Sequence, residues 1–246
     1  MSRFHVRPEA VRGDRVTFDA EESHHLARVL RLGAGDLVTA LDGGGQELIV
    51  RLTRVGTRGA EGTVVSRRAL HTESPLDLTL AQGIAKGDKM ESIIRMATEL
   101  GVTRIVPLLT ERSLVGAEAA SRRLGRWQRV SKEAAKQSGR AVIPEVAPPH
   151  TLADWLAAIG EPGLLLCLWE NERAPLNERL PAGRPFQVRV VVGPEGGLTD
   201  NEIARLRAAG AVIAGLGSRI LRTETAGPIA VALLQSRYGD LGTAGR

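Results

Sequence analysis

The sequence contains a single cysteine, Cys167, among its 246 residues. One cysteine excludes an internal disulfide and a cysteine-based zinc site, and it is compatible with a reducing compartment. Because Cys167 lies inside the apolar run LLLCLW, we expect it to be an inert buried residue. The adjacent residues His24 and His25 have no cysteine or acidic cluster beside them, so the sequence predicts no metal site.

Aromatic residues are scarce as well, at 3% of the chain. The core must therefore be packed by Leu, Val, Ile and Ala, and RNA recognition by stacking on aromatic platforms is disfavoured. The opening residues lack the apolar region of a signal peptide, and no stretch is apolar for long enough to span a bilayer. We expect a cytoplasmic protein without a membrane anchor.

Hydrophobic residues, in contrast, make up 43% of the chain, which is enough for a buried core. The formal net charge is +5 and the sequence pI is about 10.1. Such a balance favours anionic partners.

Two glycine-bearing loops near the carboxyl terminus form the most informative stretch, VVVGPEGGLT (190–199) and LGSRILRTETA (216–226). Each loop follows an apolar run and precedes a helical pattern. We therefore expect them side by side at the carboxyl edge of a sheet, where open α/β sheets bind ligands. Ordinary turns would explain the glycines, but not the charged run Leu221–Ala226.

The first loop indicates which ligand this edge would accept. Pro194 has no N–H to offer a phosphate, and Glu195 would repel one. The residues therefore favour a neutral or locally cationic small molecule over a nucleotide phosphate.

From Leu76 onward the sequence alternates between strand and helix patterns, which predicts a parallel sheet covered by helices. The predicted strands are Leu76–Gln82, Arg104–Leu109, Leu164–Trp169 and Gln187–Val192, and the predicted helices are Asp88–Leu100, Leu152–Ile159, Thr199–Ala209 and a last helix ending near Tyr238.

The N-terminal part reads differently. A helical pattern over Glu21–Leu30 is followed by β-type runs at Asp36–Leu41, Gln46–Val55 and Ala60–Arg68, separated by glycine-rich turns. Short strands with tight turns suggest a small barrel. The segment HTESP (71–75) is a plausible linker, so we predict one domain over residues 1–72 and a second over residues 73–246.

A basic helix is predicted over Ser121–Arg140, with seven Lys or Arg against one acid, Glu133. Charge of one sign along a helix is typical of a surface that binds a phosphate backbone, although a solvated face is the alternative. The basic stripe of this helix consists of Arg122, Arg126, Arg129, Lys136 and Arg140. Single candidates for RNA contact elsewhere in the chain are Arg3, His25, Arg28, Arg31, Lys86 and Lys89.

The motifs GPEGGLT and LGSRILRTETA resemble the cofactor-binding motifs of the SPOUT methyltransferases, which carry a trefoil knot in the backbone. The likeness continues through SRFHV, SHHLARVLRL, QGIAKGDKMESIIRMATELGV and RWQRVSKEAAKQSGR. Within that class the chain resembles the bacterial uridine-N3 methyltransferases of small-subunit (16S) ribosomal RNA. The resemblance implies an α/β-knot domain after an RNA-binding PUA-like β-barrel, S-adenosylmethionine as cofactor, ribosomal RNA as substrate and a homodimer.

Residue chemistry indicates the catalytic group, and the resemblance implies the cofactor-binding residues. Arg222 cannot act as a base, but its fixed charge would stabilise a uracil anion, so we expect it to be the catalytic electrostatic group. The base stays unassigned, with Glu195 and Glu224 as possible proton acceptors. The implied cofactor-binding residues are Leu168, Glu170, Gly193, Pro194, Glu195, Gly196, Leu216, Gly217, Ile220, Leu221, Thr223 and Ala226.

Two other functions remain open at this point. A non-catalytic ribosome-associated RNA-binding protein would share the basic helix but have no affinity for S-adenosylmethionine. Another SPOUT methyltransferase would act on a different base or on a ribose hydroxyl, and residue chemistry alone does not distinguish it.

Overall fold

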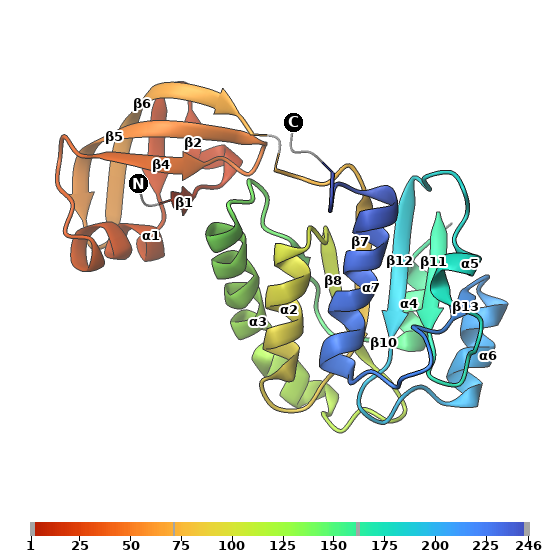
Figure 1. The fold of residues 1–246 in the computed structure, drawn as a ribbon. Helices are drawn as coiled ribbons and strands as arrows, with labels where there is room; N and C mark the ends of the chain where they lie inside the picture. The colour runs from red at the N-terminus through yellow and green to blue at the C-terminus, as the bar shows by residue number, and fades with distance from the viewer. Residues whose placement is uncertain (1–2, 71, 161–162, 244–246) are drawn as a thin grey trace. The chain divides into compact units, whose positions relative to one another are not determined.

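The structure is a computed structural model that describes residues 3–70, 72–160 and 163–243. The chain forms two compact units (Figure 1). The first holds the chain up to Glu73 together with Ala135–Ile143, and the second begins at Ser74 and holds most of the remainder. The domain boundary after residue 72 stays a prediction.

The first unit is built on a curled six-stranded sheet in the order β1-β4-β5-β6-β3-β2. Strand β1 pairs in parallel with β4, and the other neighbours are antiparallel. Its core includes Phe4 and Phe18, whose rings meet edge-on at 5.9 Å. The strands are β1 Arg3–His5, β2 Val11–Arg12, β3 Arg15–Phe18, β4 Leu37–Leu41, β5 Gln46–Gly56 and β6 Gly59–Ala69.

The helical segment of this unit changes character part-way. Asp19 caps the N-terminus of helix α1 (Ala20–His24), and its side chain accepts a hydrogen bond from the backbone N–H of Glu22 at 2.8 Å. It continues as a π-helix, η2 (His25–Val29), so the predicted helix is present but is not regular throughout. A short 3-10 helix, η1 (Pro8–Ala10), precedes β2.

The second unit contains a parallel sheet in the order β10-β8-β7-β12-β11-β13, with β9 beside β8. Every pair in it is parallel, which confirms the predicted sheet. Its strands are β7 Asp77–Gly83, β8 Arg104–Leu109, β9 Glu145–Val146, β10 His150–Thr151, β11 Leu164–Leu168, β12 Gln187–Val192 and β13 Val212–Ala214.

Helices cover both faces of this sheet, with α2 and α7 on one face and α4 and α6 on the other (Figure 1). Helix α6 begins with a capping box between Thr199 and Glu202. The helices are α2 Lys89–Glu99, α3 Ala117–Ser138, α4 Leu152–Ala158, α5 Leu176–Arg179, α6 Asp200–Ala208 and α7 Thr223–Tyr238.

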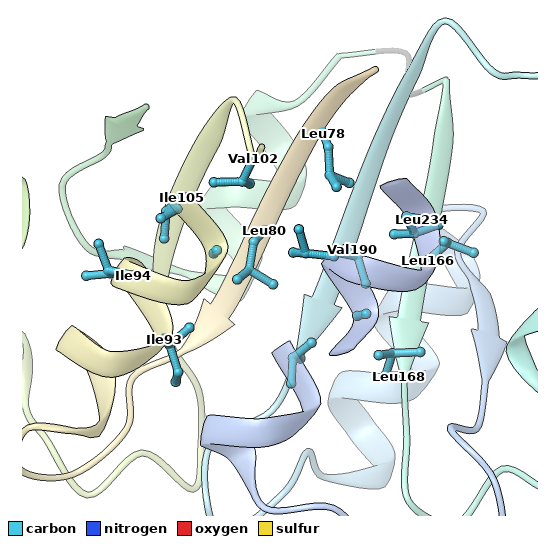
Figure 2. Packing of buried hydrophobic residues seen from close by; sticks show 14 of the residues in the cluster. Leu78, Leu80, Ile93, Ile94, Val102, Ile105, Leu166, Leu168, Val190 and Leu234 are labelled. Carbon is cyan, nitrogen blue, oxygen red and sulfur yellow. The ribbon is translucent and has the colours of Figure 1, made fainter. Parts of the chain in front are cut away.

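Alternate strand residues build a core on each face. Figure 2 shows Leu80 and Val190 beside Ile93 of α2 and Leu234 of α7, and each of these side chains is fully buried. Full burial of such a side chain stabilises the fold by about 1.5–3 kcal/mol.

Cys167 belongs to the core on the opposite face, so the expectation of a buried thiol is confirmed. Burial raises the pKa of this thiol to about 12, because a thiolate is poorly stabilised among apolar neighbours. Among the helices that the structure describes, none is both long and apolar enough to cross a membrane.

Candidate functional site

A pocket of about 540 Å³ lies beyond the carboxyl ends of β11, β12 and β13. Its walls are the two glycine-bearing loops, which the parallel sheet brings together as expected. Every residue expected at the cofactor lines this pocket: Leu168, Glu170, Gly193, Pro194, Glu195, Gly196, Leu216, Gly217, Ile220, Leu221, Thr223 and Ala226.

A buried amide fixes the two loops relative to each other. Gln82, at the end of β7, has no solvent exposure, and its Nε2 donates to Thr223 Oγ1 at 2.9 Å and to the carbonyl of Gly193 at 3.4 Å. Thr223 Oγ1 in turn donates to the carbonyl of Gly193 at 2.8 Å. The start of α7 is thereby tied to the end of β12. Sequence reasoning missed Gln82, although a glutamine ending an apolar strand run was a usable signal.

Glycine allows the loop backbone to pack closely at two points. A Cβ on Gly83 would overlap the backbone of Pro194. Gly197 has a φ of 71°, and a Cβ there would overlap the carboxylate of Glu170. Arg112 holds the outer side of the loop, because its Nη1 donates to the carbonyl of Gly196 at 3.0 Å.

Lys89 lies at the pocket between two carboxylates. Its Nζ is 3.2 Å from Glu195 Oε1 and 3.4 Å from Glu224 Oε2, and all three residues line the pocket. The hydrogen bond to Glu195 is the main reason that the pKa of Lys89 is raised. Lys89 therefore lines the pocket, and its contact with RNA stays a prediction.

Glu195 is an ionised partner for that lysine. Burial raises the pKa of its carboxyl, but hydrogen bonds from backbone N–H groups and from Lys89 outweigh burial, so the pKa is lowered overall. One of these N–H groups is that of Lys86, 3.0 Å from Glu195 Oε1. The side chain of Lys86 is exposed.

Arg222 lines the same pocket at the N-cap of α7, and its side chain is exposed. The cavity is lined by the carboxylates of Glu170, Glu172, Glu195 and Glu224 and by the cations Lys89, Arg219 and Arg222. Carboxylates therefore outnumber cations among the lining residues.

The basic residues predicted on one helix divide into two groups. Arg122, Arg126 and Arg129 of α3 are exposed, with Arg122 paired to Glu118 and Arg126 Nε 2.7 Å from Glu91. These residues are accessible to a polyanion.

Lys136 and Arg140 belong to the first unit and take part in its internal packing. Lys136 Nζ is 2.6 Å from Glu22, whose side chain is 1% exposed, and Arg140 is buried with its Nη2 2.6 Å from Glu73. Arg140 also lies beyond the end of α3. The structure therefore contradicts an exposed stripe that continues through these two residues.

The remaining candidates for RNA contact lie in the first unit. Arg3 is partly exposed and 3.9 Å from Glu47, while His25 packs edge-on against Phe4 at 5.6 Å. Arg28 and Arg31 are exposed, and Arg31 has a φ of 54°. Their part in binding RNA stays a prediction.

Comparison with known proteins gives two family matches. A family model described as RNA methyltransferase domain matches residues 72–235, and one described as RNA methyltransferase PUA domain matches residues 18–65. The second match agrees with the PUA-like fold expected of the first unit.

Relatives that cover most of the chain carry the name ribosomal RNA small subunit methyltransferase E. The one from Synechocystis sp. is 39% identical over 95% of this chain and 77% of its own length, and the one from Bacillus subtilis is 34% identical over 84% of each. The solved methyltransferase E of Neisseria gonorrhoeae, bound to S-adenosylmethionine, is 36% identical with a TM-score of 0.85 and covers 98% of this chain and 99% of its own. A Legionella pneumophila methyltransferase, also in complex with S-adenosylmethionine, is 33% identical with a TM-score of 0.87, covering 97% and 98%.

Proposed function

Because this chain belongs to the ribosomal RNA small subunit methyltransferase E family, we propose that it transfers a methyl group from S-adenosylmethionine to N3 of a uridine in small-subunit (16S) ribosomal RNA. The observation that carries the proposal is the pocket between the two glycine-bearing loops, in a chain whose solved relatives bind S-adenosylmethionine with closely similar folds.

The pocket suits this cofactor in size and in charge. Its volume of about 540 Å³ is in the usual range for small-molecule sites. Leu168, Leu216 and Leu221 supply apolar walls, while the lining carboxylates suit a ligand that carries a sulfonium and an ammonium. When bound, S-adenosylmethionine supplies an electrophilic methyl group.

The protein contributes chiefly by holding groups in place. Gln82 and Thr223 hold the loops, so the pocket is preorganised before a ligand binds. Arg222, exposed at the pocket, contributes a fixed positive charge that lowers the cost of forming an anion on the acceptor base.

Three further features expected from the family resemblance are also proposed for this protein. We propose a homodimer, a knotted path through the pocket loops, and RNA binding by the first unit together with the exposed arginines of α3. A substrate in the small ribosomal subunit makes the cytoplasm the compartment in which the protein acts.

Nucleoside mass spectrometry of ribosomal RNA tests the proposal directly. Small-subunit RNA from cells lacking the gene should lose 3-methyluridine, and the intact gene supplied in trans should restore it. Unchanged 3-methyluridine, with loss of a methylated guanine or ribose instead, would establish a different acceptor. Calorimetry that detects no binding of S-adenosylmethionine or its demethylated product would favour a non-catalytic RNA-binding protein.

A further inference from the structure

The proposed reaction leaves one chemical question open. Uridine N3 carries a proton, and N3 attacks a methyl group well only after that proton has left. Removing the proton spreads negative charge over N3 and the two flanking carbonyl oxygens, O2 and O4. A site for this reaction therefore needs a proton acceptor beside a fixed hydrogen-bond donor.

Lys89 has the properties of that donor. An ammonium group has three N–H donors, and two of them are directed to Glu195 and Glu224. The side chain is 38% exposed and lines the pocket. One N–H is therefore left for a ligand, on a cation whose position is fixed by two carboxylates from different loops.

Glu224 has the properties of the acceptor, and Glu195 does not. Glu195 Oε1 already accepts from the N–H of Lys86 at 3.0 Å and from Lys89. Glu224 Oε2 is shielded from solvent and contacts only the ammonium of Lys89, at 3.4 Å, while the side chain as a whole is 23% exposed and no hydrogen bond within the described residues occupies Oε1. The hydrogen bonds to Glu195 lower the pKa of its carboxyl overall, which weakens it as a proton acceptor.

The backbone around Glu224 is fixed. It lies in the first turn of α7, directly after Thr223, which is held by Gln82 and by the carbonyl of Gly193. Its side chain is 23% exposed and lines the pocket with Lys89. The pair thus presents a donor beside an acceptor, 3.4 Å apart, at the wall of the cavity.

The Lys89–Glu224 pair is complementary to the edge of uracil that carries N3–H and a carbonyl oxygen. Uracil offers a carbonyl oxygen next to N3–H, so one atom accepts where its neighbour donates. Cytosine reverses both roles at these positions, because its N3 accepts and its amino group donates. An ammonium beside a carboxylate therefore favours uracil and leaves cytosine with two repulsive contacts.

We propose that Lys89 and Glu224 act together on the acceptor base: Lys89 donates a hydrogen bond to a uracil carbonyl oxygen, and the Glu224 carboxylate accepts the proton of N3. The N3–H electron pair stays on N3 and then forms the new bond to the methyl carbon, while the carbon–sulfur pair remains on the departing sulfur. Glu224 afterwards releases the proton to solvent. The inference rests on the proposed function and names two catalytic residues for it.

The pH dependence of single-turnover methylation tests the role of Glu224. The substrate is small ribosomal subunits isolated from cells that lack the gene, and the full-length protein carries Glu224→Gln. At about pH 7 its rate should fall about 10²-fold, because a general base contributes at least that much. Between about pH 7 and pH 9 the rate should then rise about tenfold per pH unit, since the uracil must ionise without help.

Matched variants separate the roles of the three residues. Glu195→Gln should slow the reaction without producing the tenfold rise in rate per pH unit. Lys89→Met should lose about 10²-fold in rate, as loss of one anion-stabilising donor does, and Lys89→Arg should recover part of it. Calorimetry should show that Glu224→Gln still binds S-adenosylmethionine, and circular dichroism should show that each variant is folded.

Two results would overturn the inference: a Glu224→Gln variant with the rate and pH profile of the wild type, or the steep profile in Glu195→Gln instead. If Lys89→Met does not fold, the Glu224→Gln profile alone decides. Failure of the proposed function looks different, because the wild-type protein itself would then form no 3-methyluridine on these subunits.

Discussion

The pocket and the surface of α3 hold their charges in different ways. In the pocket, Lys89 is shared between two carboxylates, and buried hydrogen bonds of Gln82 hold the surrounding loops. On α3, Arg122 pairs with Glu118, and the two side chains are 65% and 87% exposed. Exposed ion pairs contribute about 0–1 kcal/mol, so Arg122 can exchange a carboxylate for a phosphate at little cost. The pocket charges cannot rearrange as freely, which suits them to chemistry.

A similar contrast holds between Arg126 and Arg140. Both pair with a glutamate, but the side chain of Arg140 is 5% exposed and that of Arg126 is 62% exposed. The same residue type therefore stabilises the fold in one place and is available to a ligand in the other. The degree of burial, and not the residue type, decides whether an arginine stabilises the fold or is available to a ligand.

Arg222→Ala should have the largest effect and tests whether the pocket carries the chemistry. We expect turnover to fall by about 10²–10³, because a fixed charge near the developing anion is lost. Calorimetry should show that binding of S-adenosylmethionine largely survives. Arg205→Ala, which removes an exposed arginine of α6, serves as the control. Near-normal turnover of Arg222→Ala would contradict the assignment.

Arg140→Met should come next and tests the contrast between buried and exposed arginines. Both Nε and Nη2 of Arg140 donate to Glu73, at 3.1 and 2.6 Å. Loss of these charged hydrogen bonds should lower the free energy of unfolding by about 2–3 kcal/mol, with Glu73 still partly solvated. Denaturant titration of Arg122→Met should show a change below about 1 kcal/mol. Equal losses of unfolding free energy in Arg140→Met and Arg122→Met would contradict the distinction between buried and exposed arginines.

Gly83→Ala should have a smaller effect and tests how tightly the pocket is built. The added Cβ would overlap the backbone of Pro194, so we expect a cost of about 1–3 kcal/mol in unfolding free energy. Calorimetry should also show weaker binding of S-adenosylmethionine. Gly125→Ala is the matched control, because a Cβ there meets open space within α3 and should stabilise the helix by about 0.5–1 kcal/mol.

Arg129→Ala should have the smallest effect and tests α3 as an RNA-binding surface. Loss of one phosphate contact should weaken RNA binding modestly and reduce the slope of log K against log salt concentration by about 1. Filter binding at several salt concentrations measures this slope. An unchanged slope, with Arg205→Ala as the comparison, would exclude Arg129 from the interface.

The sequence was sufficient to predict the parallel sheet and the place of the pocket. Strand β12 begins and ends where the predicted strand Gln187–Val192 does, because its four valines are buried in the sheet. The glycine loops could be placed together because parallel strands end at one edge of their sheet. These features depend on short stretches of sequence, and the fold follows from them.

Other features depend on partners that are distant in sequence. Strand β1 was not predicted, since three residues give no periodicity and it forms only through pairing with β4. Nor did the charges of Lys89 and Arg140 show whether each would face RNA, a carboxylate in the pocket or a carboxylate inside the first unit. That choice is made by Glu195, Glu224 and Glu73, whose proximity only the folded chain establishes.

The buried position of Cys167 on β11 has a practical consequence. Its thiol stays protonated at any pH used for labelling, so maleimide reagents should not modify the folded protein. A cysteine introduced at exposed Ser218, on the pocket rim, would then be the sole reactive thiol of the chain. A fluorophore attached there would report ligand arrival in real time, without a cysteine-free background having to be made first.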